Sequence, residues 1–281
     1  MKKQQRTLFC AGFGDSAKAL ARILAAEGWV IVPTTRSEDT RAQLQAEGYN
    51  AQLFEDGIDK KVPENAVWLI STAPDEKGCP SFNLLQNAAQ HACSIFYLST
   101  TGVYGDLDGG WAFEWTPVNP QSPQGERRVL AESQWRGVRP DTSFVRLPGI
   151  YGPGRSAFDR LEDGKARRII KDGQVFSRVH FDDIAACLKG AIEHDVKGAV
   201  LHACDDEPAP PQDVIEYAAN VMGVDVPPDI PFEEAGLSEM AKRFYAECKR
   251  VSNARTKSLT GWRPIYADYR EGLQAIWSAR D

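Results

Sequence analysis

Short apolar runs alternate with stretches of helical spacing along the first half of the chain. The apolar runs predict strands at residues 7–11, 29–33, 51–54, 66–71 and 94–99. The stretches between them predict helices at residues 17–27, 38–47 and 82–92. Strands that alternate with helices are typical of a parallel sheet covered by helices on both faces.

The second half of the chain is less regular. Two further strands are expected at residues 142–146 and 199–203, and segments rich in proline and glycine lie between and after them. The proline-rich stretch 207–211 opens a mostly helical portion. We expect this portion to form a smaller lobe that caps the carboxyl edge of the sheet.

The turn after the first predicted strand reads Gly12-Phe13-Gly14-Asp15-Ser16-Ala17, and it opens the first predicted helix. This is the pattern G-x-G-x-x-A, in which the first glycine makes a tight turn and the second lets the backbone approach a pyrophosphate. The third position needs only a small side chain, so that the helix packs on the strand. The helix N-terminus then offers unpaired N–H groups to phosphate. A glycine turn without a ligand is the alternative.

These patterns together predict an α/β protein with a Rossmann-type doubly wound parallel sheet and a smaller, mostly helical C-terminal lobe. We expect residues 1–150 to form a dinucleotide-binding domain. Residues 151–281 are expected to supply the remaining sheet strand and a small substrate-binding lobe. The two parts are interleaved in this prediction and have no clean boundary.

The end of the second predicted strand bears on the choice of dinucleotide. Domains that prefer NAD place an Asp or Glu there to bind the ribose 2′-hydroxyl. This chain has Thr35-Arg36-Ser37, and its first acid is Glu38. A guanidinium and two hydroxyl groups suit a 2′-phosphate, so NADP is expected and NAD is less favoured. The alternative is that Arg36 is a solvated residue at the start of a helix.

Composition and charge limit the kinds of partner that the sequence predicts. The 281 residues carry a net charge of −6 and contain no run of lysine or arginine, so we expect no nucleic-acid partner. The six cysteines are scattered without a C-x-x-C pair, which is typical of reduced cysteines in a cytosolic protein. No apolar stretch is long enough for a signal peptide or a membrane span. A cytoplasmic protein without a membrane partner is therefore expected.

Four further motifs follow in order along the chain: Leu98-Ser99-Thr100-Thr101-Gly102-Val103-Tyr104-Gly105, then 146–154, then Val179-His180-Phe181-Asp182-Asp183-Ile184, then 202–208. The second of them reads Arg146-Leu147-Pro148-Gly149-Ile150-Tyr151-Gly152-Pro153-Gly154. In the same order they resemble the V-Y-G, R-x-x-x-x-Y-G-P-G, V-H-V-D-D and D-D-E-P segments of the extended short-chain dehydrogenases/reductases, the NAD(P)-dependent epimerase/dehydratase family. The resemblance covers nearly the whole chain and implies a Rossmann fold that binds NAD(P).

The chain departs from this family at the catalytic pair. Family members carry Tyr-x-x-x-Lys within P-x-x-x-Y-G-x-x-K-x-x-x-E, and the chain keeps that frame over residues 120–132. Gln124 stands in place of the tyrosine and Arg128 in place of the lysine. An amide has no accessible proton-transfer pKa, so Gln124 cannot act as the acid. Arg128 stays charged and can still bind a ribose, a phosphate or a substrate, and we keep it among the catalytic candidates.

The resemblance also implies roles for other residues of the cleft. Thr100 matches the catalytic Ser/Thr that hydrogen-bonds the reacting oxygen, and a hydroxyl that only satisfies the backbone at the strand end is the alternative. Tyr104 is a candidate substitute acid, although its family counterpart is usually structural. The nicotinamide half of the cofactor is expected to run along a group of nearby residues: Ser71, Thr72, Ala73, Pro148 and Gly149. We assign no metal site.

Two functions stay open at this point. The first is an NADP-dependent oxidoreductase or epimerase-like enzyme that acts on a small polar or nucleotide-linked substrate. The second is a regulatory protein that senses NADP without turnover. The retained Thr100 favours the enzyme, whereas the replaced Tyr/Lys pair favours the sensor. A homodimer is compatible with either function.

Overall fold

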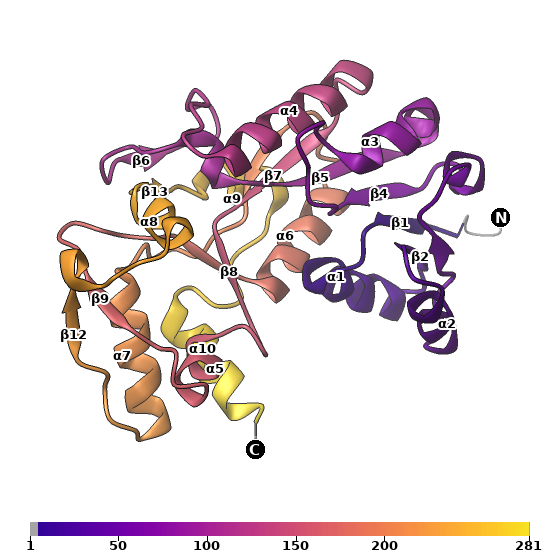
Figure 1. Ribbon diagram of the computed structural model, residues 1–281. Coiled ribbons are helices and arrows are strands. Elements are labelled where there is room, and N and C mark those ends of the chain that lie inside the picture. The colour runs from indigo at the N-terminus through magenta and orange to yellow at the C-terminus, as the bar shows by residue number, and fades with distance from the viewer. Residues whose placement is uncertain (1–4, 281) are drawn as a thin grey trace.

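Seven parallel strands form the central sheet (Figure 1). The computed structural model describes residues 5–280, so residues 1–4 and 281, at the ends of the two expected domains, lie outside the described part. The order is β11-β7-β5-β4-β1-β2-β3, and every neighbouring pair is parallel. The strands are β1 Thr7–Ala11, β2 Val30–Thr35, β3 Gln52–Leu53, β4 Val67–Ile70, β5 Ser94–Thr100, β7 Ser143–Leu147 and β11 Val200–His202. The expected doubly wound parallel sheet is confirmed.

The central strands are apolar because both of their faces are covered. In β1, Leu8 and Cys10 point into one core layer, while Phe9 and Ala11 point into the other, as the twofold alternation of a strand requires. All four side chains are fully buried. Buried parallel strands therefore read as continuous apolar runs, which is the pattern seen in the sequence.

Helices cover the two faces of the sheet. The layer on one side contains α1 Asp15–Ala26 and α6 Phe181–Glu193, which lie side by side (Figure 1), with α9 Ala254–Thr260 against α6. The other layer contains α3 Pro80–Leu85 and α4 Pro123–Val138, with the 3₁₀ turns η1 Ile58–Lys61 and η2 Gln86–His91. Helix α2 Glu38–Ala46 packs at the edge, against β2 and β3.

One helix of the structure differs from its predicted bounds. The helix expected at residues 82–92 begins earlier, at Pro80, and ends at Leu85. A proline suits the first helical turn because its φ is already fixed there. The chain continues as η2, since tighter 3₁₀ turns are common at helix ends.

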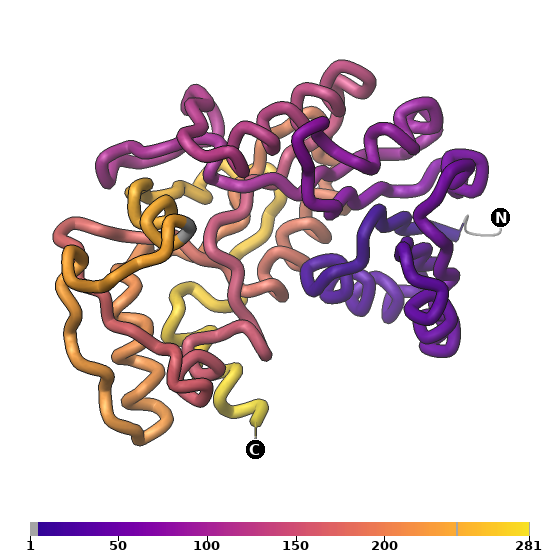
Figure 2. The backbone as a smooth tube through the Cα atoms, viewed as in Figure 1, coloured from indigo at the N-terminus to yellow at the C-terminus, as the bar shows by residue number. Residues whose placement is uncertain are grey.

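The C-terminal lobe is assembled from stretches that leave the sheet and return to it, which Figure 2 shows along the chain. Its elements are β8 Gly149–Tyr151, α5 Ala157–Glu162, β9 Arg168–Ile170, β10 Arg178–His180, α7 Pro211–Met222, β12 Asp229–Pro231, η4 Phe232–Glu234, α8 Glu239–Tyr245 and α10 Tyr269–Ser278. A separate core holds the helices α5, α7 and α10 together around Phe158, Tyr269 and Leu273. The short pair β6 Trp111–Ala112 and β13 Arg250–Val251 lies beside the 3₁₀ turn η3 Thr101–Tyr104.

Among the described residues, no helix is both long enough and apolar enough to span a membrane.

Candidate functional site

Gly12 makes the turn at the end of β1. Its φ is +90°, a conformation that favours glycine, and a Cβ there would lie 2.8 Å from the Oγ of Ser71. Its N–H donates to the hydroxyl of Thr34 at 3.0 Å, and that hydroxyl donates to the carbonyl of Cys10 at 2.9 Å. The turn is therefore fixed against the ends of both neighbouring strands, β2 and β4.

Gly14 is the N-cap of α1 and leaves the helix end open. No side chain caps this end, and a Cβ on Gly14 would meet no atom within 4 Å. The first intrahelical bond runs from Lys18 N to Gly14 O, so the N–H groups before it have no partner within the helix. These N–H groups border space that a phosphate can enter. Ala17 is fully buried in the core layer of α1, as the third position of the pattern requires.

A cavity of about 170 Å³ lies at this helix end. It is lined by residues from α1, from the carboxyl ends of β4, β5 and β7, and from α4 and β8: Gly14, Asp15, Ser16, Ala17, Ser71, Leu98, Ser99, Arg128, Leu147 and Ile150. β1 and β4 are neighbours, and β2 lies on the far side of β1. This is the point where the strand order reverses, and ligands of doubly wound sheets bind there.

The structure brings together six of the sequence-predicted residues on this cavity, Gly14 to Ala17 with Ser71 and Arg128. Other candidates do not line it but stand next to lining residues in the sequence. Pro148 and Gly149 connect Leu147 to Ile150, and the hydroxyl of Thr72, which precedes Ala73, lies 2.7 Å from that of Ser81. The ring of Phe13 packs edge-on against Tyr49 at 5.3 Å.

Four lining residues are not singled out by the sequence analysis: Leu98, Ser99, Leu147 and Ile150. Ser99 lies near the carboxyl end of β5, next to Thr100 in the quoted motif. Its place at the end of a buried strand is the signal that could have found it, because the carboxyl ends of parallel strands line the ligand crevice.

At the end of β2, the side chains of the predicted 2′-phosphate site lie at the surface. The N–H of Ser37 donates to the hydroxyl of Thr35 at 3.2 Å, and the Oγ of Ser37 accepts from Thr40 N and caps α2. Both oxygens accept, so both hydroxyl groups keep a proton to donate. Arg36 is exposed and makes no ion pair with any residue in the range 5–280.

Thr100 and Tyr104 are engaged within the protein. The Thr100 hydroxyl accepts from Gly102 N at 3.1 Å, the backbone role weighed as the alternative. Tyr104 is fully buried, its hydroxyl lies 2.6 Å from Nε2 of His202, and it accepts from Arg146 at 2.9 Å. Burial raises the pKa of Tyr104 to about 12. Tyr104 does not line the cavity, so its role as a substitute acid stays a prediction and the proposed function does not depend on it.

The buried hydroxyl of Tyr104 belongs to a polar chain that reaches the cavity. Arg146 forms a two-pronged ion pair with Glu132, at 3.0 and 2.6 Å, and Ser99 donates to the same carboxylate at 2.6 Å. At the other end, burial lowers the pKa of His202 to about 4, so this ring is neutral at pH 7. Its Nδ1 then donates to the carbonyl of Ser252 at 2.8 Å while Nε2 accepts from Tyr104. Every side chain of this network has its hydrogen-bond partners, so the network holds Ser99 in a fixed position in the cavity wall.

Arg128 and Gln124 lie on the first two turns of α4. Arg128 donates to the carbonyl of Leu98 at 2.5 Å and to the hydroxyl of Tyr97 at 3.1 Å, which anchors the guanidinium against β5 while part of it lines the cavity. Gln124 is exposed and does not line it.

A larger hollow of about 450 Å³ lies between Tyr217 of α7 and Ser278 of α10. It is shallow and open, and it lies on the lobe away from the strand ends. We therefore take the cavity at α1 as the candidate site.

Comparison with known proteins agrees with this architecture. A conserved protein of unknown function from Silicibacter pomeroyi is 44% identical, with a TM-score of 0.90 over 99% of this chain and 100% of that chain. An NAD complex of dTDP-glucose 4,6-dehydratase from Bacillus anthracis superposes with a TM-score of 0.75 at 16% identity, over 99% of this chain and 97% of that one. The chain has the fold of the extended short-chain dehydrogenases/reductases.

Within this fold, a human epimerase family protein solved with NADPH superposes with a TM-score of 0.73 at 15% identity, over 98% of this chain and 99% of that one. No family model matches the chain. A 3-diazoavenalumate denitrifying reductase from Streptomyces is 27% identical over 176 residues, 59% of this chain and 54% of the reductase. The chain thus spans about half the length of this curated relative, and its distant sequence similarity is to reductases.

Proposed function

We propose that this protein binds NADP(H) in the cavity at α1 and acts as a reductase or epimerase-like enzyme on a small polar or nucleotide-linked substrate. The observation that carries the proposal is the open N-terminus of α1, where a Cβ on Gly14 would meet no atom within 4 Å. The relatives support it, since one structure holds NADPH and another holds NAD.

The residues present fit such a cofactor. In this proposal, Gly12 to Ala17 bind the pyrophosphate, and Ser71 to Ala73 border the cofactor on the β4 side. Pro148 and Gly149 border it on the β7 side. Thr35, Arg36 and Ser37 donate to the 2′-phosphate, which favours NADP over NAD. When bound, the nicotinamide supplies hydride transfer.

The chain's own residues then orient the substrate. Arg128 is held against β5 by Leu98 O and Tyr97 and presents its remaining N–H groups to the cavity. Ser99 donates its proton to Glu132, so its oxygen is free only to accept a hydrogen bond from a ligand. Thr100 can still donate its own proton, because its oxygen only accepts from Gly102.

One observation favours a second candidate, a regulatory protein that binds NADP without turnover. Neither Gln124 nor the buried Tyr104 offers the cavity an acid. In this alternative, cofactor binding changes the contacts of the protein with a partner.

The double substitution Gln124→Tyr with Arg128→Lys separates the two functions. It restores a tyrosine whose pKa of about 10 is lowered by the neighbouring lysine. Both proteins are assayed with NADPH against aldehydes, ketones and nucleotide sugars. We expect turnover by the wild type and its loss in the double variant, because Arg128 contacts the substrate. An inert wild type with activity gained only in the double variant would support the sensor. Tight NADPH binding without activity in either protein would contradict the enzyme.

A further inference from the structure

Arg128 is hydrogen-bonded through a single guanidinium nitrogen. Its Nη1 donates to the carbonyl of Leu98 at 2.5 Å and to the hydroxyl of Tyr97 at 3.1 Å. Both partners are neutral, since burial raises the pKa of Tyr97 and keeps the phenol protonated. Nε and Nη2 make no hydrogen bond to any residue in the range 5–280, and neither atom is buried. This Nε–Nη2 edge is therefore open, on a residue that lines the cavity at α1.

Two other arginines share this use of Nη1, and each also holds a carboxylate. In Arg146, Nη1 donates to the hydroxyl of Tyr104, while Nε and Nη2 donate to the two oxygens of Glu132 at 3.0 and 2.6 Å. In Arg139, Nη1 donates to two backbone carbonyls, while Nε and Nη2 donate to the two oxygens of Asp141 at 2.7 and 2.9 Å. The Nε–Nη2 edge matches a planar carboxylate, and in both residues an acid of the chain fills it.

At Arg128 no acid of the described part of the chain fills that edge. Glu132 follows one turn later on α4, but its oxygens already accept from Arg146 and Ser99. Asp15 also lines the cavity, but it lies in the first turn of α1, is exposed and makes no ion pair with Arg128. The guanidinium thus faces the cavity with its charge uncompensated.

The open edge lies away from the turn that is expected to hold the pyrophosphate. Arg128 is held on β5, and β4 separates β5 from β1, where Gly12 makes that turn. Neighbouring strands lie about 4.8 Å apart, so the anchor of Arg128 is about 10 Å from the line of β1. The wall beside it is apolar apart from Ser99, with Leu147 and Ile150. A charge attracts its partner more strongly in such surroundings than in open water.

We propose that the Nε–Nη2 edge of Arg128 binds a carboxylate of the substrate, so that the protein acts on small carboxylic acids. The bound carboxylate completes the arrangement that Arg139 and Arg146 already have. That the ligand is a substrate rests on the proposed function. That the edge binds a carboxylate does not, and the two claims are tested separately.

The test is calorimetric titration of the full chain with oxamate and with its uncharged methyl ester, with and without saturating NADPH. NADPH does not reduce the amide of oxamate, so binding is measured without turnover. Oxamate should bind at least about tenfold more tightly than the ester, because its contact with the guanidinium is charge-assisted. Arg128→Gln should abolish this difference. Arg128→Lys keeps the charge but not the planar fork, and it should weaken oxamate binding several-fold.

The control is Arg127→Gln, which removes the same charge from the adjacent residue. The guanidinium of Arg127 pairs with the exposed Glu76, so this variant should bind oxamate like wild type. NADPH is titrated alone against all variants. Its affinity for Arg128→Gln should stay within about threefold of wild type, since charges about a Debye length apart are largely screened.

Several results would overturn the proposal. They are a wild type that binds oxamate no better than the ester, a folded Arg128→Gln protein with unchanged oxamate affinity, and equal weakening by Arg127→Gln. A loss of NADPH affinity in Arg128→Gln as large as the loss for oxamate would make Arg128 a cofactor ligand instead. Tighter binding of inorganic phosphate than of oxamate would assign the edge to phosphate. If the wild type failed to bind NADPH but bound oxamate through Arg128, the proposed function would fail and the carboxylate site would stand.

Discussion

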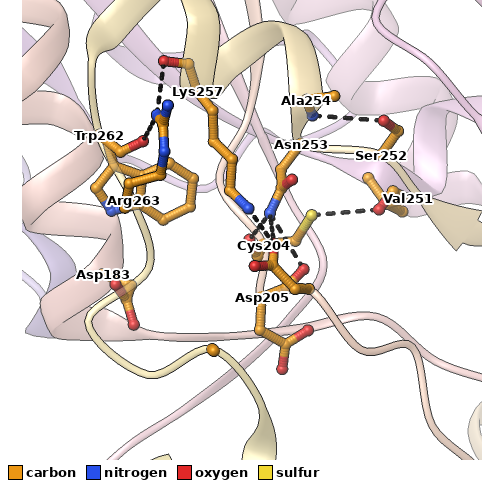
Figure 3. A network of polar contacts seen from close by, with 12 residues as sticks. Asp183, Cys204, Asp205, Val251, Ser252, Asn253, Ala254, Lys257, Trp262 and Arg263 are labelled. Atoms are coloured by element: carbon orange, nitrogen blue, oxygen red, sulfur yellow. Dashed lines mark hydrogen bonds and ion pairs between the residues drawn. The ribbon is translucent and has the colours of Figure 1, made fainter.

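At the scale of single residues, the side chain that sequence patterns cannot classify is Asp205. It lies three residues after the end of β11, and Figure 3 shows its carboxylate pointing away from the polar network around it. In that network, Asn253 donates to Cys204 O at 2.8 Å and to Oδ1 of Asp206 at 2.7 Å, and Lys257 also pairs with Asp206. Both oxygens of Asp205 are buried and have no hydrogen-bond partner among residues 5–280. The sequence shows two adjacent acids, and only the fold decides which of them is desolvated.

This environment makes stability depend on pH. The pKa of Asp205 is raised to about 8 by burial, so between its unfolded value and pH 8 the folded state binds a proton that the unfolded state lacks. Stability therefore falls as pH rises through this window. An asparagine cannot ionise, so Asp205→Asn avoids this fall in stability. The variant should be more stable than the wild type at pH 8.5 by on the order of a few kcal/mol, with less effect at pH 5. Urea unfolding at both pH values measures this, with the exposed Asp172→Asn as control. A stabilisation that does not grow with pH would contradict the burial argument.

At the scale of elements, the strands and the cofactor turn follow directly from the sequence, because burial on both faces and the glycine pattern are local signals. Gly12 and Ala17 could be assigned in this way, the one by its turn and the other by its small size. The split of the expected helix 82–92 into α3 and η2 could not, because no glycine or proline marks the junction between Leu85 and Gln86. The pairing of Ser99 with Glu132 also needed the fold, since Glu132 lies 33 residues away on α4.

The position of α1 is tested by Ala17→Leu. Ala17 is fully buried against the sheet, so three added carbons should push the helix outward and cost about 1–3 kcal/mol. The fold should survive, but the N–H groups at the helix end should no longer point at the phosphate. NADPH affinity should therefore fall at least about tenfold. Fluorescence titration measures the affinity, and the exposed neighbour Lys18→Leu is the control. A folded Ala17→Leu protein that binds NADPH like wild type would show that α1 does not form the phosphate site.

At the scale of the whole molecule, the lobe and its link to the sheet depend on contacts that local patterns do not encode. Tyr104 and His202 lie 98 residues apart and bond within the interior. Arg167 donates to the carbonyl of Ala235 in the lobe, and the two residues are 68 positions apart. The family resemblance indicated that a lobe exists, whereas the long-range contacts that assemble it became visible only in the folded structure.

The central claim is that one ligand, NADP(H), spans the molecule's edge from the α1 turn to the end of β2. It is tested most directly by fluorescence titration of the wild-type protein with NADPH and NADH in parallel, together with Arg36→Asp. Arg36 is exposed and unpaired with any described residue, so its replacement should not disturb the fold. We expect the wild type to bind NADPH at least about tenfold more tightly than NADH, since a phosphate–guanidinium contact is charge-assisted. Arg36→Asp should narrow or reverse that preference. Equal affinities of the wild type for the two cofactors, or no binding of either, would contradict the account.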